Sequence, residues 1–230
     1  MNKPKPPLWA AVPVKAFGEA KTRLSAALCA ADREGLARAM LEDVLHALSQ
    51  SIQVSRIVVV TADAVVADLA RSHDAEVLHD HRLAGQSAAV EQAAAAFTAD
   101  GGIAMLTVPG DLPLLTAQDI DSAGVLLTDE VPLVLMPAGN DGGTNGLLCQ
   151  LPNQLTFHFG EDSFNKHCQI AKLLGLPFAV SRAAGFQLDL DRPADLEAFS
   201  IKCSQTQSAI FLSNKKITRI MGEPLGSMDR

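Results

Sequence analysis

The chain alternates between short apolar runs and longer segments in which hydrophobic residues recur every three or four positions. Apolar runs rich in β-branched residues are typical of buried strands, and the longer spacing is typical of amphipathic helices. The segment "RIVVVT" (56–61) is apolar almost throughout, as expected for a strand covered on both faces. A helix is predicted from Asp32, a candidate N-cap, through the apolar positions Leu36, Met40, Leu41, Val44, Leu45 and Leu48.

Strands and helices are predicted to alternate along most of the chain. Strands are predicted at 8–14, 56–61, 75–79, 103–108, 131–137, 146–150 and 178–182. Helices are predicted at 32–48, 63–72, 84–99, from about Thr116, at 163–175 and at 192–201 with Pro193 in the first turn. This order predicts an α/β fold with a mostly parallel central sheet covered by helices on both faces. Such sheets bind ligands beyond the carboxyl ends of their strands.

The C-terminal segment differs in character from the rest of the chain. We place a single domain over 1–203 and a separate tail over 204–230, which is polar and basic with short apolar patches. This composition favours a partly ordered tail. A docking arm and a contact in a homodimer are the alternatives.

Composition excludes several classes of protein. The formal net charge of −7 argues against the basic field that nucleic-acid-binding proteins use. The four cysteines are scattered, without the spacing of a zinc site, and indicate reduced thiols. The N-terminal "MNKPKPPLWA" lacks an apolar signal core, and no apolar stretch reaches the roughly 20 residues of a membrane span. We therefore expect a soluble, cytoplasmic protein with no membrane partner.

The first candidate for chemistry is the basic loop "VPVKAFGEAKTRLS" (12–25). Lys15, Lys21 and Arg23 follow a predicted strand and lie around Gly18. Backbone N–H groups and cationic side chains in such a loop can hold a polyphosphate. The Walker A pattern is absent, and a solvated basic loop is the alternative.

The second candidate is Asp111 in "VPGDLPLL" (108–115), just past the carboxyl end of the strand predicted at 103–108. Its carboxylate is a suitable ligand for Mg²⁺, which prefers one or two carboxylates together with substrate phosphates. The alternative is an Asx-turn, in which the side chain bonds its own backbone.

The third candidate is the acid pair in "FQLDLDRPADL" (186–196). Asp189 and Asp191 point the same way if the backbone is extended, and a divalent cation would relieve their repulsion. Asp191 could instead cap the helix that Pro193 begins. Asp195 and Glu197 suit the dipole of the same helix.

The fourth candidate combines "NDGGTNGLL" (140–148) with "FHFGEDSFNKH" (157–167). Thr144 and Asn145 offer hydroxyl and amide donors, and Ser163 is placed to cap a helix whose first N–H groups are free for an anion. His158 and His167 are too far apart for a metal pair on one helix, and His167 is more typical of a packed residue than of a catalytic base. No Ser-His-Asp order or reactive cysteine is apparent, which favours metal-assisted transfer between two phosphorylated molecules.

Taken in order, "VPVKAFGEAKTRLS", "VPGDLPLL", "DGGTNGLL", "FGEDSF" and "LDLDRPADL" make the chain resemble the phospho-acid guanylyltransferases of deazaflavin coenzyme (F-420) biosynthesis over about 10–200. The resemblance implies a Rossmann-like, glycosyltransferase-A type nucleotidyltransferase fold. It also implies a Mg²⁺-dependent enzyme that transfers GMP from GTP to a small phosphorylated acid and releases pyrophosphate. The acceptor would be 3-phospho-D-glycerate or 2-phospho-L-lactate ahead of phosphoenolpyruvate, and a downstream transferase of the pathway would take the product.

The resemblance also assigns roles to individual residues. It implies that Asp111 and Lys21 are catalytic and that Asp111, Asp189 and Asp191 hold Mg²⁺. The acceptor would contact Thr144, Gly160 and Ser163. The nucleotide would contact Lys15, Lys21, Arg23, Gly85, Gln86, Ser87, Pro109 and Gly110. One departure is "LAGQSAAV" (83–90), because relatives often carry Gly-Leu-Asn where this chain has Gly85, Gln86 and Ser87.

Three alternatives stay open at this point. A nucleotidyltransferase of the same fold that acts on a sugar phosphate or a molybdopterin would share the basic loop and the strand-end acid. The "DLD" sequence is also found in haloacid-dehalogenase-type phosphatases, although those enzymes place it after an early strand. A nucleotide-binding module without catalysis would not need two separate acid sites.

Overall fold

The computed structural model describes residues 7–81, 84–139, 142–201 and 205–215. Within these residues the chain forms a seven-stranded sheet with the strand order β3-β2-β1-β4-β6-β5-β7. β6 is antiparallel to both of its neighbours, and the other pairings are parallel. The strands are β1 (Leu8–Pro13), β2 (Val54–Thr61), β3 (Glu76–His79), β4 (Ala104–Thr107), β5 (Leu133–Pro137), β6 (Thr144–Gln150) and β7 (Phe178–Val180). The predicted α/β class with a mostly parallel sheet is confirmed.

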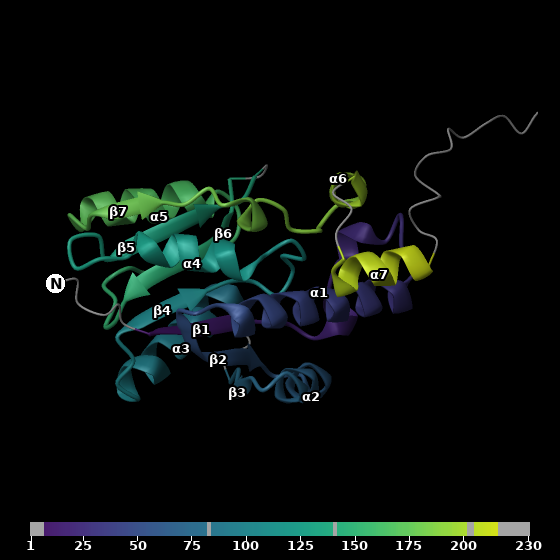
Figure 1. The fold of residues 1–230 in the computed structure, drawn as a ribbon, viewed down its shortest axis with the longest axis horizontal. Coiled ribbons are helices and arrows are strands. Elements are labelled where there is room, and N and C mark those ends of the chain that lie inside the picture. Colours follow the sequence, from purple (N-terminus) through teal and green to yellow (C-terminus); the bar gives the residue numbers. More distant parts are fainter. Residues whose placement is uncertain (1–6, 82–83, 140–141, 202–204, 216–230) are drawn as a thin grey trace, which may run out of the picture.

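Helices cover both faces of the sheet and bury two separate cores (Figure 1). One core contains the apolar faces of α1, α2 and α4, and the other contains those of α3 and α5. Successive residues of β1 serve opposite cores, because side chains alternate along a strand: Ala10 and Val12 face the first core and Ala11 faces the second. The helices are α1 (Ala30–Gln50), α2 (Ala64–Ser72), α3 (Gln86–Ala99), α4 (Ala117–Val125), α5 (Ser163–Leu173), α6 (Pro193–Ile201) and α7 (Gln207–Asn214).

The predicted elements match these bounds closely, with two capping errors. Ser163, expected as a cap, is the first residue of α5, and Asp162 is the N-cap of that helix. The helix expected from Asp32 begins at Ala30, with Cys29 as its N-cap, so Asp32 lies in the first turn. There its carboxylate accepts a hydrogen bond from the Cys29 thiol and pairs with Lys215 at 2.8 Å. The helix expected from about Thr116 begins at Ala117. Thr116 is its N-cap, and the side chains of Thr116 and Asp119 form a reciprocal capping box.

Helix α7 lies within the segment expected to be a tail, and it packs along α1 (Figure 1). Asp43 of α1 accepts hydrogen bonds from the backbone N–H of Gln207 at 2.6 Å and from that of Ser208 at 3.0 Å. The ring of Phe211 lies against Gly35, where an added Cβ would be 2.5 Å from the ring. Residues 207–214 therefore dock on the domain, while residues 216–230 of the expected tail lie outside the described residues.

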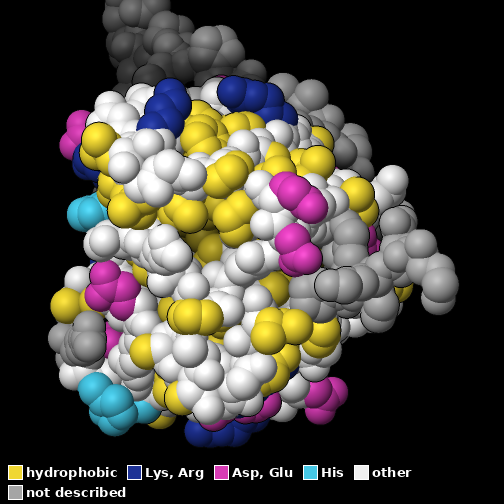
Figure 2. Space-filling model, turned by 90° about the vertical axis from the view of Figure 1, so that its left-hand side faces the viewer, with side chains coloured by type: hydrophobic (Ala, Val, Ile, Leu, Met, Phe, Trp, Pro, Cys, Tyr) yellow, Lys and Arg dark blue, Asp and Glu magenta, His cyan; other side chains and the backbone are white. Residues whose placement is uncertain are grey.

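The end of the molecule where the parallel strands begin carries a group of hydrophobic side chains. Figure 2 shows this end, with hydrophobic side chains gathered near its centre and most charges around its rim. Ile52 precedes β2, Ile103 precedes β4 and Leu173 ends α5, and all three side chains are exposed. Among the described helices, none combines the length and the apolar character needed to cross a membrane. The carboxyl ends of the parallel strands lie at the other end, toward α6 and α7 (Figure 1).

Candidate active site

Three acidic residues and one lysine meet beyond the carboxyl ends of β1 and β4. After β1, two short 3₁₀ turns, Phe17–Glu19 and Thr22–Leu24, bring the chain back so that Lys21 points into the site. The Nζ atom of Lys21 lies 2.5 Å from Oδ2 of Asp111 and 2.6 Å from Oδ1 of Asp191. These contacts join segments that are 90 and 170 residues apart in the sequence. The structure thus brings together residues of three of the predicted motifs.

Lys21 is held in this position at a conformational cost. Its backbone is left-handed (φ 57°, ψ 34°), a region that residues other than glycine seldom adopt. Its side chain is only 5% exposed. Burial alone would lower the pKa of Lys21, but the negative charges of Asp111 and Asp191 and their hydrogen bonds outweigh it, so the pKa is raised. The ammonium therefore stays charged and neutralises the acids around it.

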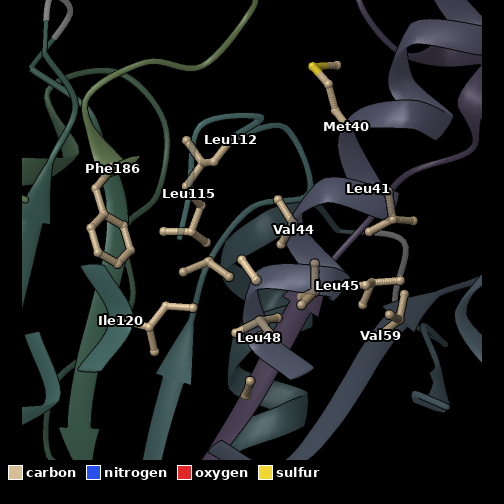
Figure 3. Close-up of a cluster of buried hydrophobic side chains, with 14 of the residues drawn as sticks. Met40, Leu41, Val44, Leu45, Leu48, Val59, Leu112, Leu115, Ile120 and Phe186 are labelled. Carbon is tan, nitrogen blue, oxygen red and sulfur yellow. The ribbon is translucent and has the colours of Figure 1, made fainter. Parts of the chain in front are cut away.

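Asp111 is fixed by the residues that follow it. Leu112 and Leu115 are buried in the core against α1, as Figure 3 shows. Gly110 lies so close to α1 that an added Cβ would be 3.2 Å from Leu41. One carboxylate oxygen of Asp111 bonds Lys21, while Oδ1 is buried without a hydrogen-bond partner. The bond to Lys21, and not an Asx-turn, accounts for this residue.

Asp189 is an acid of this cluster with a raised pKa. Burial, and after it the charges of Asp111 and Asp191, together raise its pKa to about 6. Asn145 of β6 donates a hydrogen bond to the carbonyl of Phe186 at 2.9 Å and another to Oδ1 of Asp189 at 3.3 Å. This amide ties the acid-bearing segment to the sheet and partly offsets the rise in pKa.

The pKa of Asp191 is shifted in the opposite direction from that of Asp189. Burial would raise its pKa, but Lys21 and then Arg23 attract its charge strongly enough that the pKa is lowered. Arg23 contacts it at 3.5 Å. The first turn of α6 is closed by Asp195, whose carboxylate accepts hydrogen bonds from the N–H groups of Asp191 and Arg192. The capping role considered for Asp191 is thus carried out by Asp195.

The three carboxylates are chemically suited to a hard divalent cation. The charges of Asp111 and Asp191 both act on Asp189, so the three groups lie near one another. The buried, unpartnered Oδ1 of Asp111 is a further oxygen ligand of the kind Mg²⁺ prefers. Among the residues that the structure describes, no three His, Cys, Asp or Glu side chains are already arranged as a metal site, and the Lys21 ammonium bridges two of the acids.

The predicted acceptor residues form a second cluster at the start of β6 and α5. Thr144 and Ser163 are both buried, and their hydroxyl oxygens lie 3.2 Å apart. Gly160 is exposed and has a φ of 114°, and an added Cβ there would meet no atom within 4 Å. The structure adds His167, whose Nδ1 lies 3.0 Å from Oγ1 of Thr144. Its position four residues after Ser163 on a helix placed both on one face, which was a signal available in the sequence.

The predicted nucleotide residues are less tightly grouped. Lys15 is exposed and lies outside the hydrogen-bonded acid cluster, whereas Pro109 and Gly110 lead directly into Asp111. Gly85 has a φ of 88° and precedes α3, which Gln86 begins. The Ser87 hydroxyl accepts a hydrogen bond from the N–H of Phe159 at 2.9 Å, which connects the start of α3 to the segment before α5.

Comparisons with known proteins agree with this arrangement. The family model "Guanylyl transferase CofC like" matches residues 8–224. The phosphoenolpyruvate guanylyltransferase of Roseiflexus castenholzii is 41% identical over 189 residues, which are 82% of this chain and 86% of that protein. The 3-phospho-D-glycerate guanylyltransferase of Phenylobacterium zucineum is 40% identical over 179 residues, 76% of this chain and 82% of that protein. The 2-phospho-L-lactate guanylyltransferase of Methanothermobacter thermautotrophicus is 33% identical over 211 residues, 91% of each.

A solved structure bears on the fold. The protein from Desulfovibrio desulfuricans G20 described as a nucleotide-diphospho-sugar transferase has a TM-score of 0.76 and covers 92% of this chain and 96% of its own, at 16% identity. The Rossmann-like transferase fold implied by the five motifs is confirmed. Because the family model and all three relatives cover most of the sequence, the chain belongs to the CofC-like guanylyltransferase family.

Proposed function

We propose that this protein transfers GMP from GTP to a small phosphorylated carboxylic acid and releases pyrophosphate. The observation that carries the proposal is the cluster of Lys21, Asp111 and Asp191, in which one buried ammonium lies between two carboxylates at the carboxyl ends of the strands. Membership of the guanylyltransferase family supports the reaction type. The proposal places the reaction in deazaflavin coenzyme (F-420) biosynthesis, where a downstream transferase would consume the product.

The reaction is an in-line displacement at phosphorus. A phosphate oxygen of the acceptor attacks the α-phosphorus of GTP, a new phosphorus–oxygen bond forms, and the bond to the β-phosphate oxygen breaks. The electron pair of that bond leaves with pyrophosphate. No protein nucleophile is required, so the residues act by positioning and by neutralising charge.

Charge neutralisation is the main task, because two polyanions must approach each other. Two unit charges about 4 Å apart interact by roughly 4 kcal/mol at an effective dielectric of about 20, and several such pairs arise between the substrates. Lys21 and Arg23 are the described cations that contact the acid cluster. In the proposed reaction Lys21 would contact a phosphate oxygen, and Arg23, which is exposed, would turn toward the β- and γ-phosphates.

Asp111, Asp189 and Asp191 are the residues that would hold Mg²⁺. When bound, the ion would polarise the α-phosphate and reduce the repulsion between the two substrates. The raised pKa of Asp189 and the unpartnered Oδ1 of Asp111 support this role, since a second positive charge would stabilise both groups.

Thr144, Gly160 and Ser163 would receive the acceptor. In this proposal the acceptor is 3-phospho-D-glycerate, 2-phospho-L-lactate or phosphoenolpyruvate, the compounds named in the relatives. All three carry a phosphate and a carboxylate a few bonds apart, so one set of hydroxyl and N–H donors can serve each of them. They differ by a hydroxyl, a methyl or a double bond, which a few side chains distinguish.

The test is a direct assay of transfer. The purified protein would be incubated with GTP, MgCl₂ and each acceptor separately, pyrophosphate would be measured, and the GMP adduct would be identified by mass spectrometry. We expect equal amounts of pyrophosphate and adduct with at least one acceptor, and slower reaction when CTP or ATP replaces GTP. Pyrophosphate release without an adduct, or no reaction with any of the three acids, would contradict the proposal.

A pair of variants makes the assay specific to the site. Asp111→Asn should reduce the rate at saturating Mg²⁺ by at least about 100-fold, because it removes a charge that contacts the reacting groups. Asp68→Asn is the matched control, since Asp68 is exposed on α2 and pairs only with Arg71 of the same helix among the contacts described. Near-wild-type activity of Asp111→Asn would refute the assignment of this residue.

A further inference from the structure

A buried histidine lies behind the proposed acceptor residues and contacts all of the segments that carry them. His167 is fully buried on α5, one turn after Ser163. Its Nδ1 lies 3.0 Å from Oγ1 of Thr144 at the start of β6, and its Nε2 accepts a hydrogen bond of 3.0 Å from the backbone N–H of His158. The ring of Phe159 packs edge-on against the imidazole, with the ring centres 5.2 Å apart.

These contacts determine which nitrogen of His167 carries the proton. The N–H of His158 can only donate, so Nε2 must be the unprotonated, accepting nitrogen. In a neutral imidazole the proton then lies on Nδ1, which donates to Thr144. Burial, and to a smaller extent the nearby His158, lower the pKa of His167 to about 4, so the neutral form is the one present near neutral pH.

The proton on Nδ1 also fixes how the two hydroxyl groups are used. Thr144 accepts from His167, so its own hydroxyl hydrogen cannot point toward the ring. The hydroxyl oxygens of Thr144 and Ser163 lie 3.2 Å apart, so one of their two hydrogens lies between them. The second hydrogen of the pair remains for another acceptor, and an anionic oxygen is the strongest acceptor available to it.

We propose that His167 is a positioning residue for the acceptor: its Nδ1–H orients the Thr144–Ser163 hydroxyl pair so that one hydroxyl donates to an anionic oxygen of the small phosphorylated acid. The inference rests on the proposed function of this site. His167 itself does not contact the substrate. Through His158 it also holds the segment that leads to Gly160, and Ser87 holds the next residue, Phe159, from the side of α3.

Two substitutions separate the two contacts of the ring. In His167→Asn, the side-chain amide can reproduce the Nδ1 donor to Thr144 but not the acceptor for His158. In His167→Gln, the longer amide can reproduce the acceptor at the Nε2 position but not the donor. The matched controls are His46→Asn and His46→Gln, since His46 lies on the exposed face of α1.

We expect the substitutions at His167 to change the KM for the acceptor but not the KM for GTP. His167→Gln should raise the KM for the acceptor about tenfold or more, since a hydrogen bond to a charged group is lost, and leave the KM for GTP within about twofold. His167→Asn should raise the acceptor KM by less than about threefold. Equal losses in the two variants, or a parallel rise in the KM for GTP, would overturn the proposal.

A second measurement does not depend on activity or on the variants folding. Two-bond ¹H–¹⁵N spectra of the histidine rings in the wild-type protein at pH 7 should show His167 as neutral with the proton on Nδ1. A charged ring, or a proton on Nε2, would overturn the proposal. Because this spectrum needs no substrate, it separates a failure of the His167 inference from a failure of the proposed reaction.

Discussion

Lys21 and Asp111 form an ion pair of 2.5 Å across 90 residues of sequence, and the same ammonium lies 2.6 Å from Asp191. In the free protein the lysine neutralises acids that would repel one another, and these are the same acids that are proposed to hold a divalent cation. If the acids hold a divalent ion as proposed, the ion and Lys21 should compete for the carboxylates of Asp111 and Asp191. This relationship gives the first two predictions.

Lys21→Met should strongly destabilise the metal-free protein. Removing one partner of a fully buried ion pair typically costs about 3 to 5 kcal/mol, and the loss here should be smaller because Asp111 and Asp191 are partly exposed. Chemical denaturation in EDTA would measure the loss, and added Mg²⁺ should recover part of it. Lys172→Met, at an exposed position on α5, is the control. A loss no greater than in the control would show that the acid cluster does not need this lysine.

Chelation should abolish GMP transfer without unfolding the protein. The two cores are built from apolar side chains of the sheet and the helices and do not depend on the acid cluster. We expect activity to disappear in EDTA and to return with added Mg²⁺, while the far-ultraviolet circular dichroism stays constant. Full activity in the presence of a chelator would exclude the metal role proposed for Asp111, Asp189 and Asp191.

Asp189 should make the free protein less stable as the pH rises. Its pKa is about 6 in the folded protein and 3.8 when unperturbed, so the folded state binds the proton more tightly. The stabilising contribution of the protonated form is complete below the unperturbed pKa and is lost as the pH rises through the folded pKa. This rise in pKa corresponds to roughly 3 kcal/mol for a fully buried group, and partial solvent exposure should reduce the value to about 2 kcal/mol.

The measurement is urea denaturation of wild type and Asp189→Asn between pH 4 and pH 7.5 in EDTA. Wild type should lose stability relative to the variant over this range, because the amide stays neutral. Stability differences that do not change with pH would show that Asp189 titrates as an ordinary surface acid.

Gly35→Ala should loosen α7 from α1. Alanine in a helix interior is normally more favourable than glycine by up to about 1 kcal/mol. Here the new methyl would lie 2.5 Å from the ring of Phe211, so the ring or the whole of α7 must move. Hydrogen exchange of residues 207–214 would detect the change, and Phe211→Ala in the same chain should restore the normal benefit of alanine. Unchanged exchange in Gly35→Ala would contradict this account of how α7 docks.

The layout of the fold could be predicted because apolar periodicity reports burial directly. The run at 56–61 lies in β2, and the helix with Leu36, Met40 and Val44 is α1. Asp32 was misassigned as a cap because the apolar pattern begins later than the helix does, and the first turn of α1 is exposed at Ala30. Patterning marks the buried face of a helix more reliably than its first residue.

The site was only partly predictable for a related reason. The position of Asp111 at the end of a strand and the separation of Asp189 from Asp191 by one residue are local signals. The sequence could therefore identify these three residues as candidates. The partners that set their charge states are not local: Lys21 approaches from a 3₁₀ turn, and Asn145 from an antiparallel strand. The sequence predicts that His167 is a packed residue, and it is buried. Its contacts with Thr144 and His158 are visible only in the structure, and they indicate its proposed positioning role.

The wide sequence separation of Lys21, Asp111 and Asp191 has a consequence for synthesis of the chain. During translation from the N-terminus, the lysine emerges first and its last partner emerges 170 residues later. A nascent or truncated polypeptide ending before Asp189 would carry the basic loop with an incomplete set of carboxylates. If these residues carry the proposed transfer, the reaction can begin only after nearly the whole domain has left the ribosome, and partial translation products should be inactive.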